Sequence, residues 1–393
     1  MSNTASRARS NTYTEHNKVD LVRGGKKYFD LLVKMIDDAV ETIHLQVYIF
    51  NNDETGQLVA NALVRAAARN VKIFILVDGY ASQNLPHDFI EHIRSSGIRF
   101  RFFEPLLKSH NFYFGRRLHH KVIVTDARYC MVGGINIADR YNDMPGEDAW
   151  MDWGIFAEGE VAAELFNICE ELWEKLDRGK KYSFEHIKIP DSLLNEKCHI
   201  RVRRNDWVRK YNQVSASYIE MFAKAKDQIT IMSSYFLPGR VIRKRMEAAS
   251  KRGVKIRLVL TGNSDVPITK RAERYIYRWI FKNNIRLYEY QKNVLHGKLS
   301  TYDDKWVTAG SYNVNFISAY ASIELNLDIA DDQFAVTVNK AINKIIEEDC
   351  VEILEKDYNA SYGFFSRILN RVSYDVIQFV FFLFTFYFRP KRE

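Results

Sequence analysis

Residues 119–136 read HHKVIVTDARYCMVGGIN, and residues 296–313 read HGKLSTYDDKWVTAGSYN. Both stretches have the form HxKxxxxD, followed seven residues later by a glycine and three positions further on by an asparagine. Side chains two residues apart on a β-strand point to the same face, so the histidine and lysine of each stretch lie side by side. The same spacing at two places predicts a duplicated unit.

The segments before each stretch repeat in the same order. A helical pattern at 28–41 precedes a strand pattern at 43–53, and a helical pattern at 217–227 precedes a strand pattern at 228–239. VKIFILVDG (71–79) corresponds to VKIRLVLTG (254–262), and IRFRFF (98–103) to IRLYEY (285–290). Alternating helices and apolar strands predict an α/β fold. We expect two pseudosymmetric domains, at 16–188 and 189–358, each a mixed sheet flanked by helices, with the active site at their interface.

Composition limits the class of protein. The chain has 393 residues, of which 47% are hydrophobic and 27% charged, which suits two globular domains and excludes a disordered, fibrous or polytopic membrane protein. The net charge of +8 favours an anionic partner without choosing between nucleic acid and membrane. The four cysteines form no CxxC pair, and no Cys/His spacing predicts a metal site.

The two ends of the chain differ. Residues 1–15 are polar, resemble no signal peptide and are expected to form a mobile tail. Residues 376–388 read VIQFVFFLFTFYF, with basic residues on both sides. Thirteen helical residues cover about 20 Å, short of the roughly 30 Å of a bilayer core. We therefore expect 359–393 to dip into one leaflet at the cytoplasmic face of the membrane, in a peripheral or monotopic protein; the alternative is a helix packed on the protein body.

The repeated motif suits phosphodiester chemistry. A histidine, a lysine and an asparagine side by side offer a nucleophile or proton carrier, a positive charge and an amide donor for phosphate. Two such sets allow one histidine to attack phosphorus and the other to protonate the leaving alkoxide and then deprotonate the incoming alcohol or water. We expect neither a metal nor another cofactor to be needed. The residues are His119, Lys121, Asp126, Gly133, Gly134 and Asn136 in the first set, and His296, Lys298, Asp303, Gly310, Ser311 and Asn313 in the second.

Each histidine also needs a carboxylate to fix its tautomer. Asp152 lies in an alternating pattern after the first motif, and Glu324 lies in the equivalent place after the second. Each could instead be an ordinary strand carboxylate on a solvent face. Their equivalent positions favour the functional interpretation.

These residues resemble the HKD motifs of the phospholipase D superfamily. The stretches RRLHHKVIVTDARYCMVGGINIADRY (116–141), YFLPG (235–239) and EYQKNVLHGKLSTYDDKWVTAGSYNVNFISAYASIELNLDI (289–329) are more closely similar to bacterial cardiolipin synthases. The resemblance covers residues 16–358. Since the sequence shows no pair of N-terminal transmembrane helices, it is most similar to the shorter type.

The resemblance implies an enzyme that condenses two phosphatidylglycerol molecules into cardiolipin and glycerol. By analogy alone, His119 would be the nucleophile and His296 the general acid and base. Lys121, Lys298, Asn136, Asn313 and Ser311 would hold the phosphate, and Asp152 and Glu324 would orient the histidines. Asp126 and Asp303 complete the catalytic motif, although the family implies that they lie off the phosphate. Phosphatidylglycerol, other anionic phospholipids and the membrane surface are the expected partners, without nucleic acid; the oligomeric state stays open.

Three features depart from the family pattern. Gly133-Gly134 replaces a Gly-Ser step, the strand after His296 is unusually polar, and His120 stands where the family often has arginine. Strand alternation points His120 away from His119, which favours a packed or surface histidine.

Several alternative functions share the same motifs. Within the superfamily these are a hydrolytic phospholipase D and a transferase that uses phosphatidylethanolamine as donor. A phosphodiesterase nuclease suits the positive charge, but small nucleases of the superfamily dimerise a single motif. A catalytically silent membrane scaffold is disfavoured because both motifs are intact.

Overall fold

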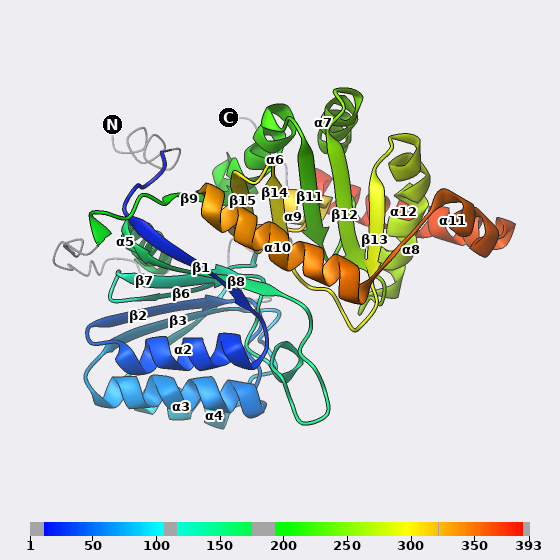
Figure 1. Cartoon of the computed structure of the whole chain (residues 1–393). Helices are drawn as coiled ribbons and strands as arrows, with labels where there is room; N and C mark the ends of the chain where they lie inside the picture. The colour runs from blue at the N-terminus through cyan, green and yellow to red at the C-terminus, as the bar shows by residue number, and fades with distance from the viewer. Residues whose placement is uncertain (1–11, 106–115, 175–192, 321, 388–393) are drawn as a thin grey trace, which may run out of the picture.

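A computed structural model describes residues 12–105, 116–174, 193–320 and 322–387 (Figure 1). Two twisted sheets lie side by side, each covered by helices on its outer face (Figure 1). Because both sheets mix parallel and antiparallel pairs, the expected α/β class with two mixed sheets is confirmed.

The first sheet has the strand order β1-β8-β7-β6-β2-β3-β4. Its strands are β1 (Asn17–Arg23), β2 (Thr42–Val47), β3 (Lys72–Asp78), β4 (Arg99–Phe103), β6 (Lys121–Thr125), β7 (Tyr129–Gly133) and β8 (Trp153–Gly159). Its helices are α2 (Lys26–Asp38), α3 (Glu54–Ala68), α4 (His87–Ser95), the short η1 (Asp139–Tyr141) and α5 (Glu160–Glu174). The alternating strands and helices up to β4 follow the hydrophobic periodicity of the sequence.

The second sheet repeats this order as β9-β16-β15-β14-β11-β12-β13, with β10 and β17 added at its edges. Its strands are β9 (His199–Asp206), β10 (Tyr211–Asn212), β11 (Gln228–Ser233), β12 (Lys255–Thr261), β13 (Arg286–Tyr290), β14 (Leu299–Tyr302), β15 (Trp306–Gly310), β16 (Ser322–Ala330) and β17 (Cys350–Glu352). Its helices are η3 (Trp207–Arg209), α6 (Gln213–Lys224), α7 (Arg240–Lys251), α8 (Pro267–Lys282), α9 (Phe316–Tyr320), α10 (Asp332–Asp349), α11 (Glu355–Ser361) and α12 (Phe364–Tyr387).

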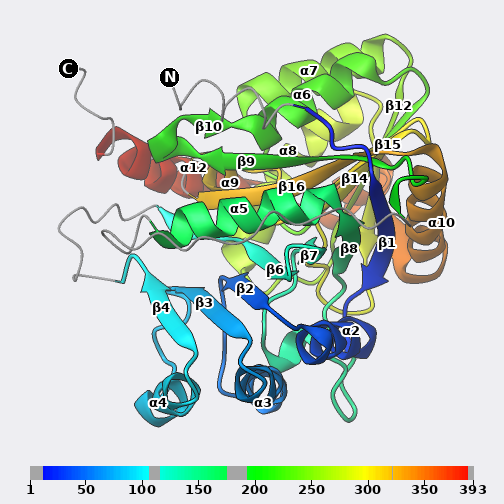
Figure 2. The ribbon, with the colours of Figure 1, turned by 90° about the vertical axis from the view of Figure 1, so that its left-hand side faces the viewer.

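One hydrophobic cluster is shared by the two sheets, in addition to the clusters within each half. Apolar residues of β6, β7 and β8 pack with those of β14, β15 and β16, and α5 and α10 supply further buried side chains. Figure 2 shows the ribbons of α5 and α10 beside these strands. Close packing across this boundary fixes the two sheets as one unit, because interior packing tolerates little displacement. The ends of the two motifs therefore meet at a defined interface.

Two strands outside the repeated segments complete the sheets. β1 pairs with β8, and β9 pairs with β16 at the equivalent position. Just before β1, the backbone of Thr14 pairs with Ile200, and the hydroxyl of Tyr13 accepts a hydrogen bond from Trp306 Nε1 at 3.1 Å. The last residues of the expected mobile tail, 12–15, are thus anchored on the second sheet, while residues 1–11 lie outside the described part.

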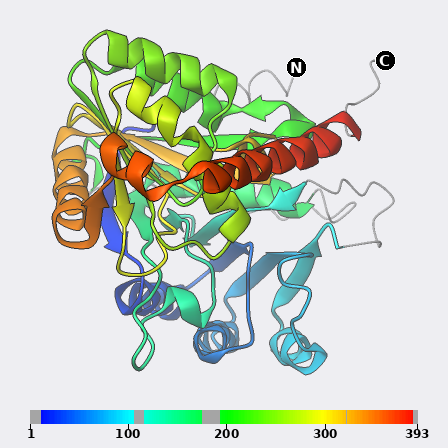
Figure 3. The same ribbon diagram turned by 90° about the vertical axis from the view of Figure 1, so that its right-hand side faces the viewer.

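The helix α12 crosses the outer face of the second half and packs mainly on α8 (Figure 3). It is longer than the thirteen-residue run that the sequence suggests, and it lies against the protein body. Among the described residues, no helix combines the length and apolarity that a membrane crossing requires. The proposed domain boundary at 188/189 falls within 175–192, outside the described residues, and stays a proposal.

Candidate active site

The two motifs meet because each one begins on a strand that pairs with the other half. β5 (Arg117–Leu118) runs parallel to the start of β16, and His119 N donates to Ile323 O at 3.0 Å. In the same way, His296 N donates to Met151 O at 2.7 Å. Each histidine is therefore held beside the strand that carries the carboxylate of the opposite half.

Glu324 of the second half holds His119 of the first. His119 Nδ1 lies 2.8 Å from Glu324 Oε2, and Glu324 is fully buried on β16. The hydroxyl of Ser311 donates to the same carboxylate oxygen at 2.5 Å. Glu324 accepting from Nδ1–H leaves His119 Nε2 with a free lone pair, which is the form that a nucleophile needs. Ser311, expected to assist at the phosphate, is engaged with Glu324.

Asp152 of the first half holds His296 of the second. His296 Nδ1 lies 2.6 Å from Asp152 Oδ2, and the backbone N–H of Trp153 donates to Asp152 Oδ1 at 2.7 Å. Asp152 stands one residue before β8, opposite Gly134. A Cβ at Gly134 would come within 2.4 Å of the Asp152 carboxylate, so the absent serine side chain makes room for it.

Two buried lysines supply the positive charge. Lys121 and Lys298 are each 2% exposed. Lys121 Nζ donates to His119 O at 2.9 Å, and Lys298 Nζ donates to Ser234 Oγ at 3.1 Å. Burial lowers the pKa of both lysines, and the charge of Lys298 further lowers the pKa of Lys121. A phosphate bound between them would relieve that repulsion, so the pair suits an anionic ligand.

The pKa values of the two histidines are both lowered. Burial lowers the pKa of His119, with Glu324 opposing the shift, and burial together with Lys298 lowers the pKa of His296 well below its usual range. Burial raises the pKa of Asp152 to about 7. Near neutral pH the nucleophile candidate is therefore uncharged, and the Asp152–His296 pair retains a proton.

The two motif asparagines occupy different environments. Asn136 Oδ1 accepts from Ile49 N at 3.1 Å, and its Nδ2 donates to Tyr141 Oη at 2.9 Å. Asn313 Oδ1 is buried without a hydrogen-bond partner. The backbone amide of Asn313 donates to Ser318 Oγ at 3.2 Å, which ties this residue to α9. The side chain of Asn136 is thus engaged in positioning the first motif, whereas the side-chain oxygen of Asn313 is still available to a ligand or to water.

The motif aspartates lie at the far ends of their strands, in the turns of the hairpins. Asp126 accepts hydrogen bonds from the backbone N–H groups of residues 40–42 at 2.8–2.9 Å, and Asp303 accepts from those of residues 226–228 at 2.6–2.9 Å. Both adopt a left-handed backbone, with φ near +52°, which aspartate tolerates. We therefore assign both to the scaffold, although the sequence groups them with the catalytic motif.

Aromatic side chains that the sequence analysis did not assign surround the histidines. Tyr48 lies edge-on to His119 at 5.0 Å between ring centroids, and Tyr141 lies edge-on to His296 at 5.2 Å. Trp150 is 6.0 Å from His296, and the exposed Arg140 stacks over its ring. Tyr48 stands out in the sequence because Tyr235 occupies the equivalent place in the second repeat. Tyr141, Trp150 and Arg140 show no such repeated signal.

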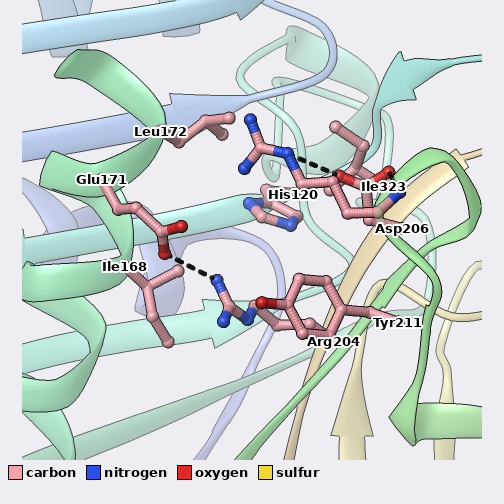
Figure 4. A pocket seen from close by; sticks show the side chains of 9 residues that line it. His120, Ile168, Glu171, Leu172, Arg204, Asp206, Tyr211 and Ile323 are labelled. Carbon is pink, nitrogen blue, oxygen red and sulfur yellow. Dashed lines mark hydrogen bonds and ion pairs between the residues drawn. The ribbon is translucent and has the colours of Figure 1, made fainter. Parts of the chain in front are cut away.

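His120 points away from the site, as strand alternation predicts. It is 1% exposed, and its Nδ1 lies 2.9 Å from Gln46 Oε1. Its ring faces a small pocket behind the motif strand, where Arg204 pairs with Glu171 at 3.3 Å (Figure 4). Burial lowers the pKa of His120 to about 3, so it is a neutral, packed residue.

The donor set of the site does not resemble a metal centre. In the described part of the chain, no group of three or more His, Cys, Asp or Glu side chains is placed to hold a metal ion. Within the site, the carboxylates are bonded to histidines and two lysine ammonium groups lie alongside. These cations suit an anionic ligand.

The chain is similar to known proteins over most of its length. The family described as "Cardiolipin synthase, PLD-like domain" matches residues 32–173 and 218–346. Cardiolipin synthase B of Escherichia coli is 29% identical over 350 residues, covering 88% of this chain and 84% of that protein. Cardiolipin synthase B of Salmonella typhimurium is 31% identical over 346 residues, covering 87% of this chain and 84% of that protein.

Solved structures show the same fold at low sequence identity. Phosphatidylserine synthase of Haemophilus influenzae superposes with a TM-score of 0.72 at 14% identity, covering 96% of this chain and 98% of that one. Polyphosphate kinase of Porphyromonas gingivalis gives a TM-score of 0.57 at 17% identity, covering 86% of this chain and 48% of that one. The expected phospholipase D-like fold and the expected enzyme class are confirmed: the chain belongs to the cardiolipin synthase family of the phospholipase D superfamily.

Proposed function

We propose that this chain transfers a phosphatidyl group from one phosphatidylglycerol to another, giving cardiolipin and glycerol through a phosphohistidine intermediate. The observation that carries the proposal is that each half supplies the carboxylate that holds the histidine of the other half, which we call the exchange of carboxylates. Each motif histidine is fixed through Nδ1 by a buried carboxylate of the opposite half, next to two buried lysines. Two oriented imidazoles at one anion site are what a two-step phosphoryl transfer requires.

The first step uses both histidines. His119 Nε2 attacks phosphorus, the bond from phosphorus to the donor's headgroup glycerol breaks, and a proton from His296 goes to the departing alkoxide. Lys121 and Lys298 offset the charge on the non-bridging oxygens. The Asp152–His296 pair suits the acid role because the raised pKa of Asp152 keeps a proton in the pair near pH 7.

The second step reverses these roles. The headgroup hydroxyl of a second phosphatidylglycerol loses its proton to His296, and its oxygen attacks phosphorus. The phosphorus–nitrogen bond to His119 breaks, and the free enzyme is restored. One phosphodiester replaces another, so the exchange needs no separate energy source. The remaining requirement is that the acceptor alcohol competes with water, which favours a sheltered site.

The membrane is the proposed working place of the enzyme. The substrates reside in a bilayer, and large apolar side chains of α12 are exposed, up to 84% at Phe365. We propose peripheral association with the cytoplasmic leaflet, as the basic residues beside this segment suggest.

A product assay tests the proposal. Purified protein receives labelled phosphatidylglycerol in mixed micelles, alongside His119→Ala. Cardiolipin and glycerol in equal amounts, lost in the variant, are expected. Phosphatidic acid as the sole product would make the protein a hydrolase, and turnover only with added phosphatidylethanolamine would change the donor. DNA cleavage without lipid turnover would contradict the lipid assignment.

A further inference from the structure

Four helices of the second half meet on one outer surface. Arg243 of α7 donates to Tyr374 Oη of α12 at 3.3 Å. Tyr275 of α8 lies 4.9 Å from the same tyrosine ring, and Phe316 of α9 lies 5.2 Å from Phe381 of α12. The helices α7, α8 and α9 thus each contact α12, which crosses this face (Figure 3). What α12 presents outward therefore decides the chemistry of the surface.

The helix α12 differs from an ordinary surface helix in where its apolar residues lie. Its polar residues Asn370 and Ser373 are buried against the body, each 4% exposed, whereas its charged residues Arg371 and Asp375 are exposed and pair at 3.7 Å. Its apolar residues point outward; they are Phe364, Phe365, Ile368, Leu369, Val372, Val376, Phe379 and Val380, with exposed fractions of 42–84%. A helix that covers a soluble core normally does the opposite. So large a group of exposed apolar side chains indicates a binding surface.

The apolar surface continues to the edge of the active site. On α9, Ile317 is 54% exposed and Tyr320 48%. The same helix supplies Ser318, whose hydroxyl accepts the hydrogen bond from the backbone of Asn313. Asn315, at the start of this segment, bonds through Nδ2 to Tyr235 O at 3.4 Å. The apolar face thus ends within a few residues of the second motif.

Basic side chains flank the apolar face. The sequences of α7 and α8 each contain five lysines and arginines and a single glutamate. Exposed members include Arg240, Lys244, Arg271 and Arg278; Arg371 on α12 itself is also exposed and pairs with Asp375 at 3.7 Å. The outer helix α2 of the first half, by contrast, has three lysines and three aspartates. An apolar face with basic flanks is complementary to an anionic leaflet, which attracts basic residues near its surface.

We infer that α12, with Ile317 and Tyr320 of α9 and the basic residues of α7 and α8, forms a docking surface that lies flat on an anionic leaflet. The helix stays packed on α8 and enters the interface sideways, so residues 364–380 contribute along its length. The docking surface places the second motif beside the lipid from which both substrates come. Only the role of this surface in supplying substrate rests on the proposed function, because membrane binding is measurable without turnover.

Charge argues against a second copy of the chain as the occupant. A twofold contact through this face would bring the same basic flanks of two copies together. Like charges facing each other across an interface are unfavourable. An anionic bilayer neutralises them.

Vesicle flotation tests the docking surface with a matched pair of variants. Val376 on α12 is 42% exposed, and Leu58 on α3 of the other half is 41% exposed. With vesicles of phosphatidylglycerol and phosphatidylcholine, Val376→Glu and Ile317→Glu should each lower the bound fraction at least tenfold, because a carboxylate resists burial in lipid. Leu58→Glu should bind as the wild type. With phosphatidylcholine alone, wild-type binding should fall by a similar factor.

Controls separate folding, self-association and chemistry. Thermal unfolding checks each variant, and Phe365→Ser, at a residue 84% exposed, replaces any variant that misfolds. Turnover of monomeric short-chain phosphatidylglycerol should stay within twofold of wild type in all variants. Unchanged flotation of the α12 and α9 variants would overturn the docking surface, as would a lipid-free dimer that Val376→Glu splits. Normal flotation without cardiolipin formation would instead contradict the proposed function and leave the surface intact.

Discussion

The two halves of the molecule share a strand order and a motif but have different surfaces. In the first half, the outer helix α2 is balanced in charge and its apolar residues face the core. In the second half, α7 and α8 are basic, and α12 adds an apolar outer face. The interface keeps the duplicated chemistry, because each half completes the site of the other. The outer surfaces carry no such constraint, and there the halves differ.

The halves also differ close to the reacting groups. Glu324 is supported by Ser311, whereas the shorter Asp152 faces Gly134 and is supported by the backbone of Trp153. His296 has Tyr141 and Trp150 beside it, whereas His119 has Tyr48. The pKa of His296 is the more strongly lowered. These differences predict unequal roles for two histidines that the sequence treats alike.

The largest expected effects come from the histidines. His119→Ala and His296→Ala should each lower cardiolipin formation by roughly 10⁴-fold or more, since each removes a group needed in both steps. A donor with a p-nitrophenol leaving group, which departs without a proton, distinguishes them. Stopped-flow measurement should show a p-nitrophenol burst in His296→Ala and none in His119→Ala. A burst in His119→Ala alone would reverse the assignment.

The exchanged carboxylates come next. Glu324→Gln and Asp152→Asn should each lower turnover by about 10²- to 10⁴-fold, because they leave the histidine tautomers unsupported. Glu324→Gln should also slow the p-nitrophenol burst, although Glu324 lies in the other half from His119. Glu158→Gln is the control, since that carboxylate pairs with Arg128 at 2.6 Å and should stay within twofold of wild type. A burst slowed by Asp152→Asn and not by Glu324→Gln would contradict the exchange.

The pH profile should report the Asp152–His296 pair. Burial raises the pKa of Asp152 to about 7, so below that pH the pair carries the proton that the leaving glycerol needs. Above it the proton is lost, and turnover should fall by up to about tenfold per pH unit. The lowered pKa of His119 keeps the nucleophile neutral throughout this range. Asp152→Asn should flatten the alkaline limb of the profile. A wild-type turnover rate that does not change between pH 7 and 9 would contradict this account.

Exchanging the small residues beside the carboxylates should give intermediate effects. Gly134→Ser places a Cβ within 2.4 Å of the Asp152 carboxylate, so we expect a loss of some tens of fold, or about 2 kcal/mol of transition-state stabilisation. Ser311→Gly removes one hydrogen bond to Glu324, for a loss of about tenfold. Steady-state kinetics of both variants tests whether Gly134→Ser loses more activity than Ser311→Gly. Gly134→Ser with full activity would show that Asp152 adjusts freely.

The smallest effect on catalysis is expected from the motif aspartates. Asp126→Asn and Asp303→Asn weaken three backbone hydrogen bonds each but keep a residue that tolerates the left-handed conformation. We expect each to lower the free energy of unfolding by about 1–3 kcal/mol, measured by urea denaturation, with kcat within twofold of wild type. A large loss of kcat at unchanged stability would return these residues to the chemistry.

The sequence by itself determined the duplicated α/β fold, the face shared by each histidine and lysine, and the two carboxylates. These features follow from local periodicity, which fixes strands and helices and the face on which each side chain lies. It also indicated an apolar C-terminal helix, but neither its full length nor its packing on α8.

Only the tertiary structure decided that Glu324 serves His119 and Asp152 serves His296. That pairing comes from β5 crossing to β16 and from Met151 contacting the second motif. The tertiary structure likewise engages Ser311 with Glu324 and brings Tyr141 and Trp150 to His296. Apart from the Ser311–Glu324 bond, which lies within one half, these contacts join residues more than a hundred positions apart. They depend on how two finished sheets pack, and no repeat within either half records that packing.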